Sequence, residues 1–140
     1  MNESIEFFFL FLSGESIESG VEREVFEETG IRARFRGILS FTYESNFRFD
    51  RGDVYFGCLM ALDETDEEQQ INFDPHEIAV CQWMSLDKSA NSPELHPTPI
   101  MLHFARMAID VLDGREKLFE GEQVKQQSWD FMSYRKISSI

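Results

Sequence analysis

The stretch between Ser16 and Gly30 constrains the fold more than any other part of the chain. Ile17, Val21 and Val25 recur at every fourth position, which is the spacing of one apolar stripe on an α-helix. Ser16 is a suitable N-cap, and Gly30 can end the helix in a left-handed conformation. The sequence therefore predicts a capped helix of three to four turns with one face against a core.

The segments after this helix favour an α/β fold. Residues 31–43 alternate apolar and polar side chains as a strand does, with a bulge or turn at Gly37, and two further apolar runs at 54–62 and 78–86 also predict strands. Helical spacing returns after Pro99 and continues to Gly114, whereas residues 115–140 are weakly periodic and predict a peripheral helix or loop. With 140 residues the chain is expected to form a single domain over 1–140.

The predicted helix carries an unusual acidic face near its end. At about 100° per residue, Glu24, Glu27 and Glu28 share one face, and Glu28 falls close to the line of Val21. The apolar stripe thus becomes acidic, although anions are disfavoured at a helix C-terminus. Arg23 can neutralise part of this charge, and a cation bound by oxygen ligands, Mg²⁺ or Mn²⁺, can offset the rest. A solvated acidic helix surface is the competing interpretation.

Charge and composition limit the partners. The net charge of −13 argues against a nucleic-acid polymer as partner. The apolar run at 7–12 is shorter than the roughly 20 residues of a membrane span, so no membrane association is expected. Cys58 and Cys81 lack metal-binding spacing and are expected to be small buried side chains in a reducing compartment. We expect the cytoplasm, with mitochondria and nucleus left open, and a homodimer is also left open.

The residues from Glu15 to Ile31 resemble the Nudix box, G-x5-E-x7-R-E-U-x-E-E-x-G-U, where U is a bulky aliphatic residue. Every defined position from Glu15 onward matches. The resemblance implies an α/β/α sandwich around a mixed sheet, and hydrolysis of a nucleoside diphosphate linked to another moiety. It also implies that Glu24 and Glu28 are the main metal ligands and Glu27 a third, with Arg23 orienting the glutamates and Glu15 fixing the loop and helix.

A downstream glutamate extends the resemblance. In many Nudix enzymes a loop glutamate before a Trp-containing strand supplies another ligand or the general base, and Glu77 stands six residues before Trp83. Glu77 is preferred over Glu64, Glu67 and Glu68, although a loop carboxylate beside a turn is an equal alternative. Trp83 is expected in the core, and the three histidines are expected to have no role at the site.

The match fails at its beginning. Phe9 stands where the box requires glycine and Phe8 where a second glycine is common, and 14 residues precede Glu15, fewer than a complete Nudix domain has. The hypothesis from the sequence is an N-terminally truncated chain: a fragment, a splice form or a mistaken gene model. The activity of such a form is uncertain, so a Nudix-like protein that acts by binding or regulation is the alternative function. ADP-ribose, NADH, nucleoside triphosphates and coenzyme A all remain open as substrates.

Overall fold

The computed structural model describes residues 4–7, 14–47, 51–63, 68–96 and 98–136. The side chains of residues 4–7, 46, 47, 51 and 129 are outside the description as well. Five strands form one sheet in the order β1-β3-β2-β4-β5. Their bounds are Ser4–Phe7 for β1, Ala33–Phe47 for β2, Arg51–Leu62 for β3, Phe119–Gln126 for β4 and Trp129–Lys136 for β5.

The helix predicted from the sequence is present as α1, Ile17–Thr29. The Ser16 hydroxyl accepts a hydrogen bond from the Ser19 backbone N–H at 3.1 Å, which satisfies one of the free donors of the first turn. Gly30 has φ 73°, and its N–H donates to the Phe26 carbonyl at 2.8 Å. Both predicted ends of the helix are therefore confirmed.

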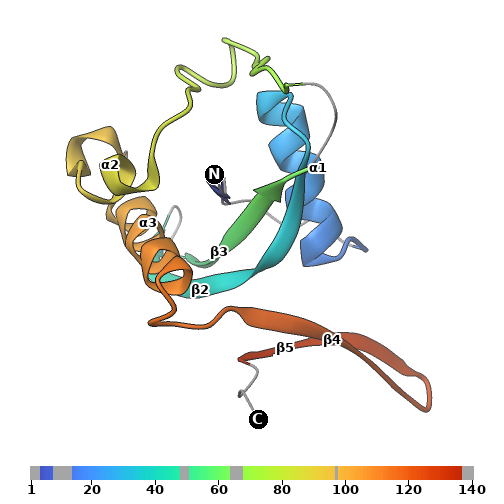
Figure 1. Cartoon of the computed structure of the whole chain (residues 1–140). Coiled ribbons are helices and arrows are strands. Elements are labelled where there is room, and N and C mark those ends of the chain that lie inside the picture. Colours follow the sequence, from blue (N-terminus) through green and yellow to red (C-terminus); the bar gives the residue numbers. More distant parts are fainter. Residues whose placement is uncertain (1–3, 8–13, 48–50, 64–67, 97, 137–140) are drawn as a thin grey trace.

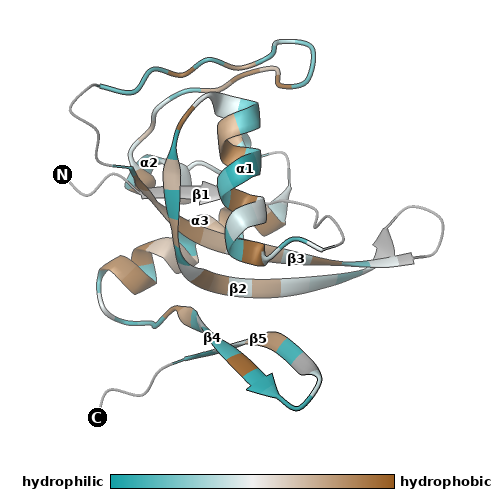
Figure 2. Ribbon diagram, turned by 90° about the vertical axis from the view of Figure 1, so that its right-hand side faces the viewer, coloured by the Kyte–Doolittle hydropathy of each residue, from teal (hydrophilic) through white to brown (hydrophobic). Residues whose placement is uncertain are grey.

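Two layers of helices enclose the central strands (Figure 1). On one side, Val21 and Val25 of α1 pack against Ile38, Cys58 and Met60. On the other side, Ala108 of α3, Pro99–Leu112, packs with Leu39 and Leu59. Neighbouring residues of one strand thus point to opposite faces, as the pleat of a strand requires. Figure 2 shows hydrophobic and hydrophilic bands alternating along α1, as expected for a helix with one buried stripe.

The α/β class and the Nudix-like sandwich are confirmed, but the expected mixed sheet differs from the structure. Every pairing among the described strands is antiparallel. The register of β2 against β3 shifts between Phe35 and Gly37, so the predicted bulge at Gly37 is also confirmed. In the described structure β4 joins the sheet through one register pair, Ile38 with Phe119.

Two expectations about secondary structure are wrong. Residues 78–85 contain no strand; they run irregularly to Ser85, the N-cap of the helix at 86–90, and β3 pairs with β1 and β2 instead. Residues 119–136 form the β4–β5 hairpin instead of a helix or loop, with Gln127 at φ 54° in its turn. Most side chains of this hairpin are exposed on both faces, so its sequence does not need the alternation that identifies a half-buried strand.

The segment after residue 86 contains two short helices, α2 at Leu86–Ala90 and the 3-10 helix η2 at Pro93–Leu95. Leu86 packs beside the cluster of Leu39 and Leu59, which fastens α2 to the α3 side of the sheet. Cys58 is buried as expected and Cys81 is half-buried, and both are free thiols. None of the described helices is long and apolar enough to cross a membrane.

Gly57 allows β3 to pack directly against α3. A Cβ added at Gly57 would clash with ring atoms of Phe104, which is fully buried. We expect Gly57→Ala to lower the free energy of unfolding by about 1–3 kcal/mol, as overpacking of a filled core does, measured by urea denaturation. Phe104→Leu in the same chain should recover part of the loss, because contacting sites are not additive. An unchanged unfolding midpoint in Gly57→Ala would show that this contact is not tight.

Candidate active site

The site begins with the way α1 places its charged residues. Val21 and Val25 are fully buried and fix the rotation of the helix on the sheet. Arg23, Glu24 and Glu28 lie beside this stripe and are only partly exposed, whereas Glu27 is exposed. The acidic face predicted from the sequence therefore lies at the margin of the core, and not opposite the core as a purely solvated face would.

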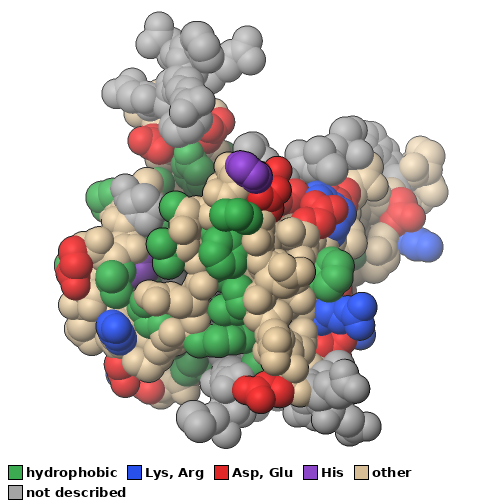
Figure 3. Space-filling view, turned by 90° about the horizontal axis from the view of Figure 1, so that it is seen from above, with side chains coloured by type: hydrophobic (Ala, Val, Ile, Leu, Met, Phe, Trp, Pro, Cys, Tyr) green, Lys and Arg blue, Asp and Glu red, His purple; other side chains and the backbone are tan. Residues whose placement is uncertain are grey.

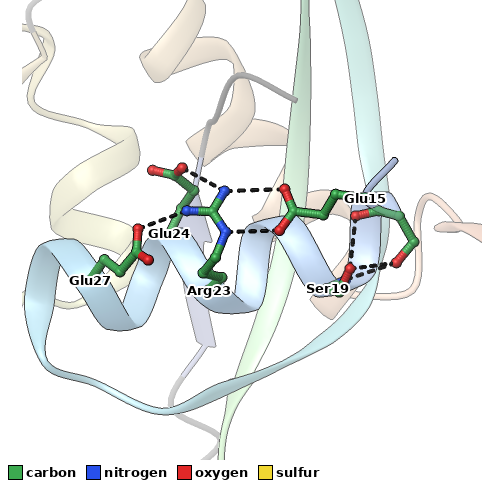
Figure 4. Close-up of polar contacts among 6 residues, drawn as sticks. Glu15, Ser19, Arg23, Glu24 and Glu27 are labelled. Carbon is green, nitrogen blue, oxygen red and sulfur yellow. Dashed lines mark hydrogen bonds and ion pairs between the residues drawn. The ribbon is translucent and has the colours of Figure 1, made fainter. Parts of the chain in front are cut away.

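Arg23 is the centre of an ion-pair network (Figure 4). Its Nε and Nη2 atoms donate to the two oxygens of Glu15 at 2.8 and 3.1 Å, in a two-point contact with a residue just before the start of α1. Nη2 also lies 2.9 Å from Glu24 Oε1, and Nη1 donates to Glu27 Oε2 at 2.7 Å. These carboxylates, Glu15 first, raise the pKa of Arg23 further above its ordinary value. One guanidinium thus holds three glutamates in a fixed arrangement.

The charge of Glu28 is not compensated by Arg23. In the described part of the chain, the ion pairs of Arg23 do not include Glu28, and the side chain of Glu28 is partly buried. Burial, followed by repulsion from Glu24, Glu77 and Glu27, raises the pKa of Glu28 above its ordinary value of 4.5. The negative charge at this position is therefore the least compensated in the cluster, and a cation placed there would relieve it.

Glu77 contributes to the raised pKa of Glu28, after burial and Glu24, although 49 positions separate the two residues in the sequence. Glu77 lies just after a turn around Asp74. The Asp74 side chain accepts from the His76 N–H at 2.8 Å, and the Asp74 carbonyl accepts from the Glu77 and Ile78 N–H groups at 3.1 and 2.9 Å. This turn fixes the backbone that carries the Glu77 carboxylate.

Residues 68–85, which we call the linker, are fastened to the end of α1 and the start of β2 by two polar residues that the sequence analysis did not single out. Asn72 donates its backbone N–H to the Thr29 carbonyl at 2.8 Å, and it lies in close contact with Gly30. The Gln69 amide binds both backbone groups of Arg32 and the Asp63 carbonyl, at 2.6 to 3.1 Å. The only signal in the sequence was the change from acids to amides at the end of DETDEEQQ.

The sequence predictions for individual side chains have mixed outcomes. Six predicted residues interact with one another. Arg23 forms ion pairs with Glu15, Glu24 and Glu27. Glu28 is repelled by Glu24, Glu77 and Glu27. Trp83, expected in the core, is 49% exposed, so that prediction is wrong. His76 is exposed as expected, and His96 lies in a turn where its Nε2 is 2.8 Å from the Ser89 carbonyl oxygen. Phe8 and Phe9 lie outside the described residues.

The donor atoms fit a hard divalent cation in type. They are carboxylate oxygens without a thiolate or imidazole, which suits Mg²⁺ or Mn²⁺. Among the described residues, however, no three His, Cys, Asp or Glu side chains already lie at metal-binding spacing. The ion pairs of Arg23 explain this, because they hold Glu24 and Glu27 toward the guanidinium. A cation at Glu28 would compete with Arg23 for these two carboxylates.

A helix with a clustered acidic end, packed on a sheet that carries helices on both faces, defines a fold and site of the Nudix class. The family model described as "NUDIX domain" matches residues 11–103 of the chain. The chain therefore belongs to the Nudix family. The match includes both the predicted box and the linker with Glu77.

Relatives with known names agree with this assignment. The chain is 35% identical over 108 residues to "Nucleoside diphosphate-linked moiety X motif 6" of Mus musculus, and the aligned segment covers 75% of this chain and 33% of that protein. It is 34% identical over 97 residues to the protein of the same name from Homo sapiens, covering 68% and 29%. It is 37% identical over 83 residues to "Nudix hydrolase 10" of Arabidopsis thaliana, covering 59% and 28%. The aligned part is thus about a third or less of the length of these relatives.

Proposed function

We propose that this chain is a divalent-metal-dependent hydrolase that cleaves the pyrophosphate of a nucleoside diphosphate linked to another moiety. The observation that carries the proposal is the position of Glu28, a partly buried carboxylate with three further carboxylates around it and a raised pKa. Such a cluster is costly without a cation and is suited to bind one. The names of the Nudix hydrolase and nucleoside diphosphate-linked relatives support the same reaction and a small nucleotide substrate.

In this proposal Glu24, Glu27 and Glu28 hold Mg²⁺ or Mn²⁺. The bound metal would neutralise the charge of the pyrophosphate and favour attack by water on phosphorus. Arg23 and Glu15 act as positioning residues, because their two-point contact fixes the guanidinium that orients Glu24 and Glu27. We further propose the cytoplasm as the compartment, since the two free cysteines suit a reducing environment.

Glu77 is the proposed general base of the reaction. Its turn is fixed by Asp74, and the repulsion between its carboxylate and that of Glu28, one cause of the raised pKa of Glu28, supports a position near the proposed metal site. From this position it can take the proton of a water that attacks phosphorus.

A hydrolysis screen tests the proposed reaction. Purified chain is incubated with ADP-ribose, NADH, a nucleoside triphosphate or coenzyme A, with Mg²⁺, with Mn²⁺ or with EDTA, and products are separated by chromatography. We expect cleavage of at least one substrate at the pyrophosphate, its loss in EDTA and its return with added Mg²⁺ or Mn²⁺. Cleavage that persists in EDTA would contradict the metal-dependent mechanism.

The alternative function, binding without useful turnover, is favoured by one observation in the sequence. Phenylalanine at positions 8 and 9 replaces the glycines that the Nudix box resemblance leads us to expect. Glycine allows backbone conformations and close approaches that phenylalanine does not. If this substitution limits the reaction, the double variant Phe8→Gly and Phe9→Gly should raise kcat. If the chain only binds nucleotides, both the wild type and the double variant should show no detectable turnover.

Replacing the proposed base gives a further test. We expect Glu77→Gln to lower kcat by about 10²–10⁴-fold, the usual contribution of a positioned base, with little change in KM. Glu68→Gln is the matched control, because Glu68 is another exposed acid in the same linker. Equal losses in the two variants would contradict the role of Glu77 as base.

A further inference from the structure

The outer edge of β5 has no neighbouring strand in the described sheet. β5 is last in the strand order, and its register pairs join it to β4 alone. Figure 1 and Figure 2 show the β4–β5 hairpin extending away from the helices. Figure 3 views the molecule from above, and its right-hand end, where the hairpin reaches furthest in Figure 1, shows acidic and basic side chains together. The backbone donors and acceptors on this edge can therefore pair with a further strand.

Much of the apolar surface of the hairpin is exposed. In the described structure the hairpin joins the sheet through one register pair, Ile38 with Phe119. Phe131 and Met132, in the middle of β5, are 48% and 36% exposed. A two-stranded hairpin is marginally stable by itself, and a further strand at its outer edge would cover part of these two side chains. The edge thus offers both hydrogen-bonding groups and apolar side chains to a partner.

The charges at the two ends of β5 have opposite signs. Asp130 lies near its start and Lys136 is its last residue, and both side chains are exposed on the same face of the sheet. If a second copy of β5 runs antiparallel with Ser133 opposite Ser133, Asp130 of each copy lies opposite Lys136 of the other. A strand protected against association carries charges that repel its own copy. The end charges of β5 attract its own copy instead.

The residues between these charges fit the same register. Met132 lies opposite Tyr134 of the second copy, which is a favourable pairing of sulfur with an aromatic ring. Phe131 lies opposite Arg135, a pairing that suits a cation–π interaction. A shift of the register by two residues in either direction separates Asp130 from its basic partner. The register that pairs the charges is therefore also the one that pairs the large side chains.

We propose that the outer edge of β5 is an interaction surface for a second copy of this chain, and that antiparallel β5–β5 pairing joins the two sheets into one. The interface is isologous, because each copy contributes the same strand about a two-fold axis. Two strands of eight residues form a small interface, so we expect micromolar association and not an obligate dimer. The proposal does not depend on the hydrolysis proposed above.

Reversal of the end charges tests the pairing. Asp130→Lys places lysines opposite each other, and Lys136→Asp places aspartates opposite each other, so neither variant should associate with itself. In an equimolar mixture of the two variants every such pair is again an acid and a base, so a heterodimer should form. The matched controls are Glu94→Lys and Lys88→Asp, which make the same charge changes at exposed residues of η2 and α2.

All samples are measured by sedimentation velocity over a series of protein concentrations, and circular dichroism checks that each variant is folded. We expect the wild type and both controls to change from monomer to dimer as the concentration rises. Each reversal alone should weaken the dimer about tenfold or more, because two attractive pairs become repulsive. A wild type that stays monomeric, reversals that associate as the wild type does, or a mixture without recovery would each overturn the proposal.

A disulfide tests the register independently of the charges. The two Ser133 residues are expected to face each other with Cα atoms about 4.5–5.5 Å apart, a separation that a disulfide can span. Oxidised glutathione should therefore convert Ser133→Cys to a covalent dimer faster than Ser128→Cys, the control in the exposed turn of the hairpin. Cys58 and Cys81 are present in both variants, so a dimer formed through them would appear in both. Equal rates in the two variants would contradict the proposed pairing.

Discussion

Glu28→Gln should remove nearly all hydrolytic activity while increasing the thermal stability of the metal-free protein. A metal ion that stabilises charge in the transition state contributes several kcal/mol, so loss of the central ligand should lower kcat/KM by about 10²–10³-fold. The increase in stability has a separate origin. The ionised carboxylate of Glu28 is partly buried and repelled by Glu24, Glu77 and Glu27, and the amide of glutamine relieves that repulsion.

The pH dependence of this effect has a definite sign. Because the pKa of Glu28 is higher in the folded state than its ordinary value of 4.5, the folded protein binds the proton more tightly than the unfolded chain. Protonation of Glu28 therefore increases the free energy of unfolding as the pH falls from above the folded pKa toward 4.5. Melting temperatures measured without metal should accordingly differ most between wild type and Glu28→Gln near neutral pH, and converge as the pH approaches 4.5.

Glu18→Gln is the control for both measurements. Glu18 is an exposed glutamate in the first turn of the same helix, away from the acidic end. Its replacement should preserve activity and should not raise the melting temperature, since an acid near a helix N-terminus is favourable. Activity close to wild type in Glu28→Gln would contradict the assignment of Glu28 as a metal ligand.

Arg23→Ala should disorganise the site and lower activity by about 10–100-fold, the range found when a residue that orients metal ligands is lost. Removal of the guanidinium leaves Glu15, Glu24 and Glu27 without their shared partner, so repulsion among the acids of α1 increases. The melting temperature should fall, and the Mg²⁺ concentration for half-maximal activity should rise. Arg23→Lys should recover only part of the activity, because an ammonium group cannot form the two-point contact with Glu15.

Arg115→Ala provides the comparison. Arg115 also pairs with two carboxylates, those of Asp110 and Asp113, but at the end of α3. Its removal should leave the metal dependence of the reaction unchanged. If Arg115→Ala and Arg23→Ala altered the metal dependence equally, the effect would come from net charge and not from the geometry around Arg23.

The parts of the fold and site that could be predicted from the sequence are those set by local chemistry. The ends of α1 follow from the hydroxyl of Ser16 and the conformational freedom of Gly30, which act within a few residues. The shared face of Glu24, Glu27 and Glu28 follows from helical geometry alone. The core contacts of Val21, Val25, Cys58 and Met60 follow from apolar patterns that had only one way to be buried.

The remainder depended on partners that a sequence pattern does not name. The apolar residues between 78 and 85 are compatible with a strand, but a strand needs a pairing partner, and β3 pairs with β1 and β2 instead. Trp83 lies in the apolar run predicted as a strand and is expected in the core, but the path of the linker leaves it 49% exposed. The β4–β5 hairpin is held by backbone hydrogen bonds between two largely exposed strands, so burial left little trace in its sequence.

The attachment of the linker has a consequence for how substrate range can change over evolution. Gln69 and Asn72 fasten one end of the linker to the α1–β2 junction, and Leu86 fastens the other end beside the α3 helix. Between the Asp74 turn that carries Glu77 and Leu86, substitutions and small insertions need disturb neither α1 nor the sheet, because lengthening a surface loop costs little. New specificities can therefore arise by sequence drift in this short segment, while the carboxylates of α1 stay under the constraint of their helix.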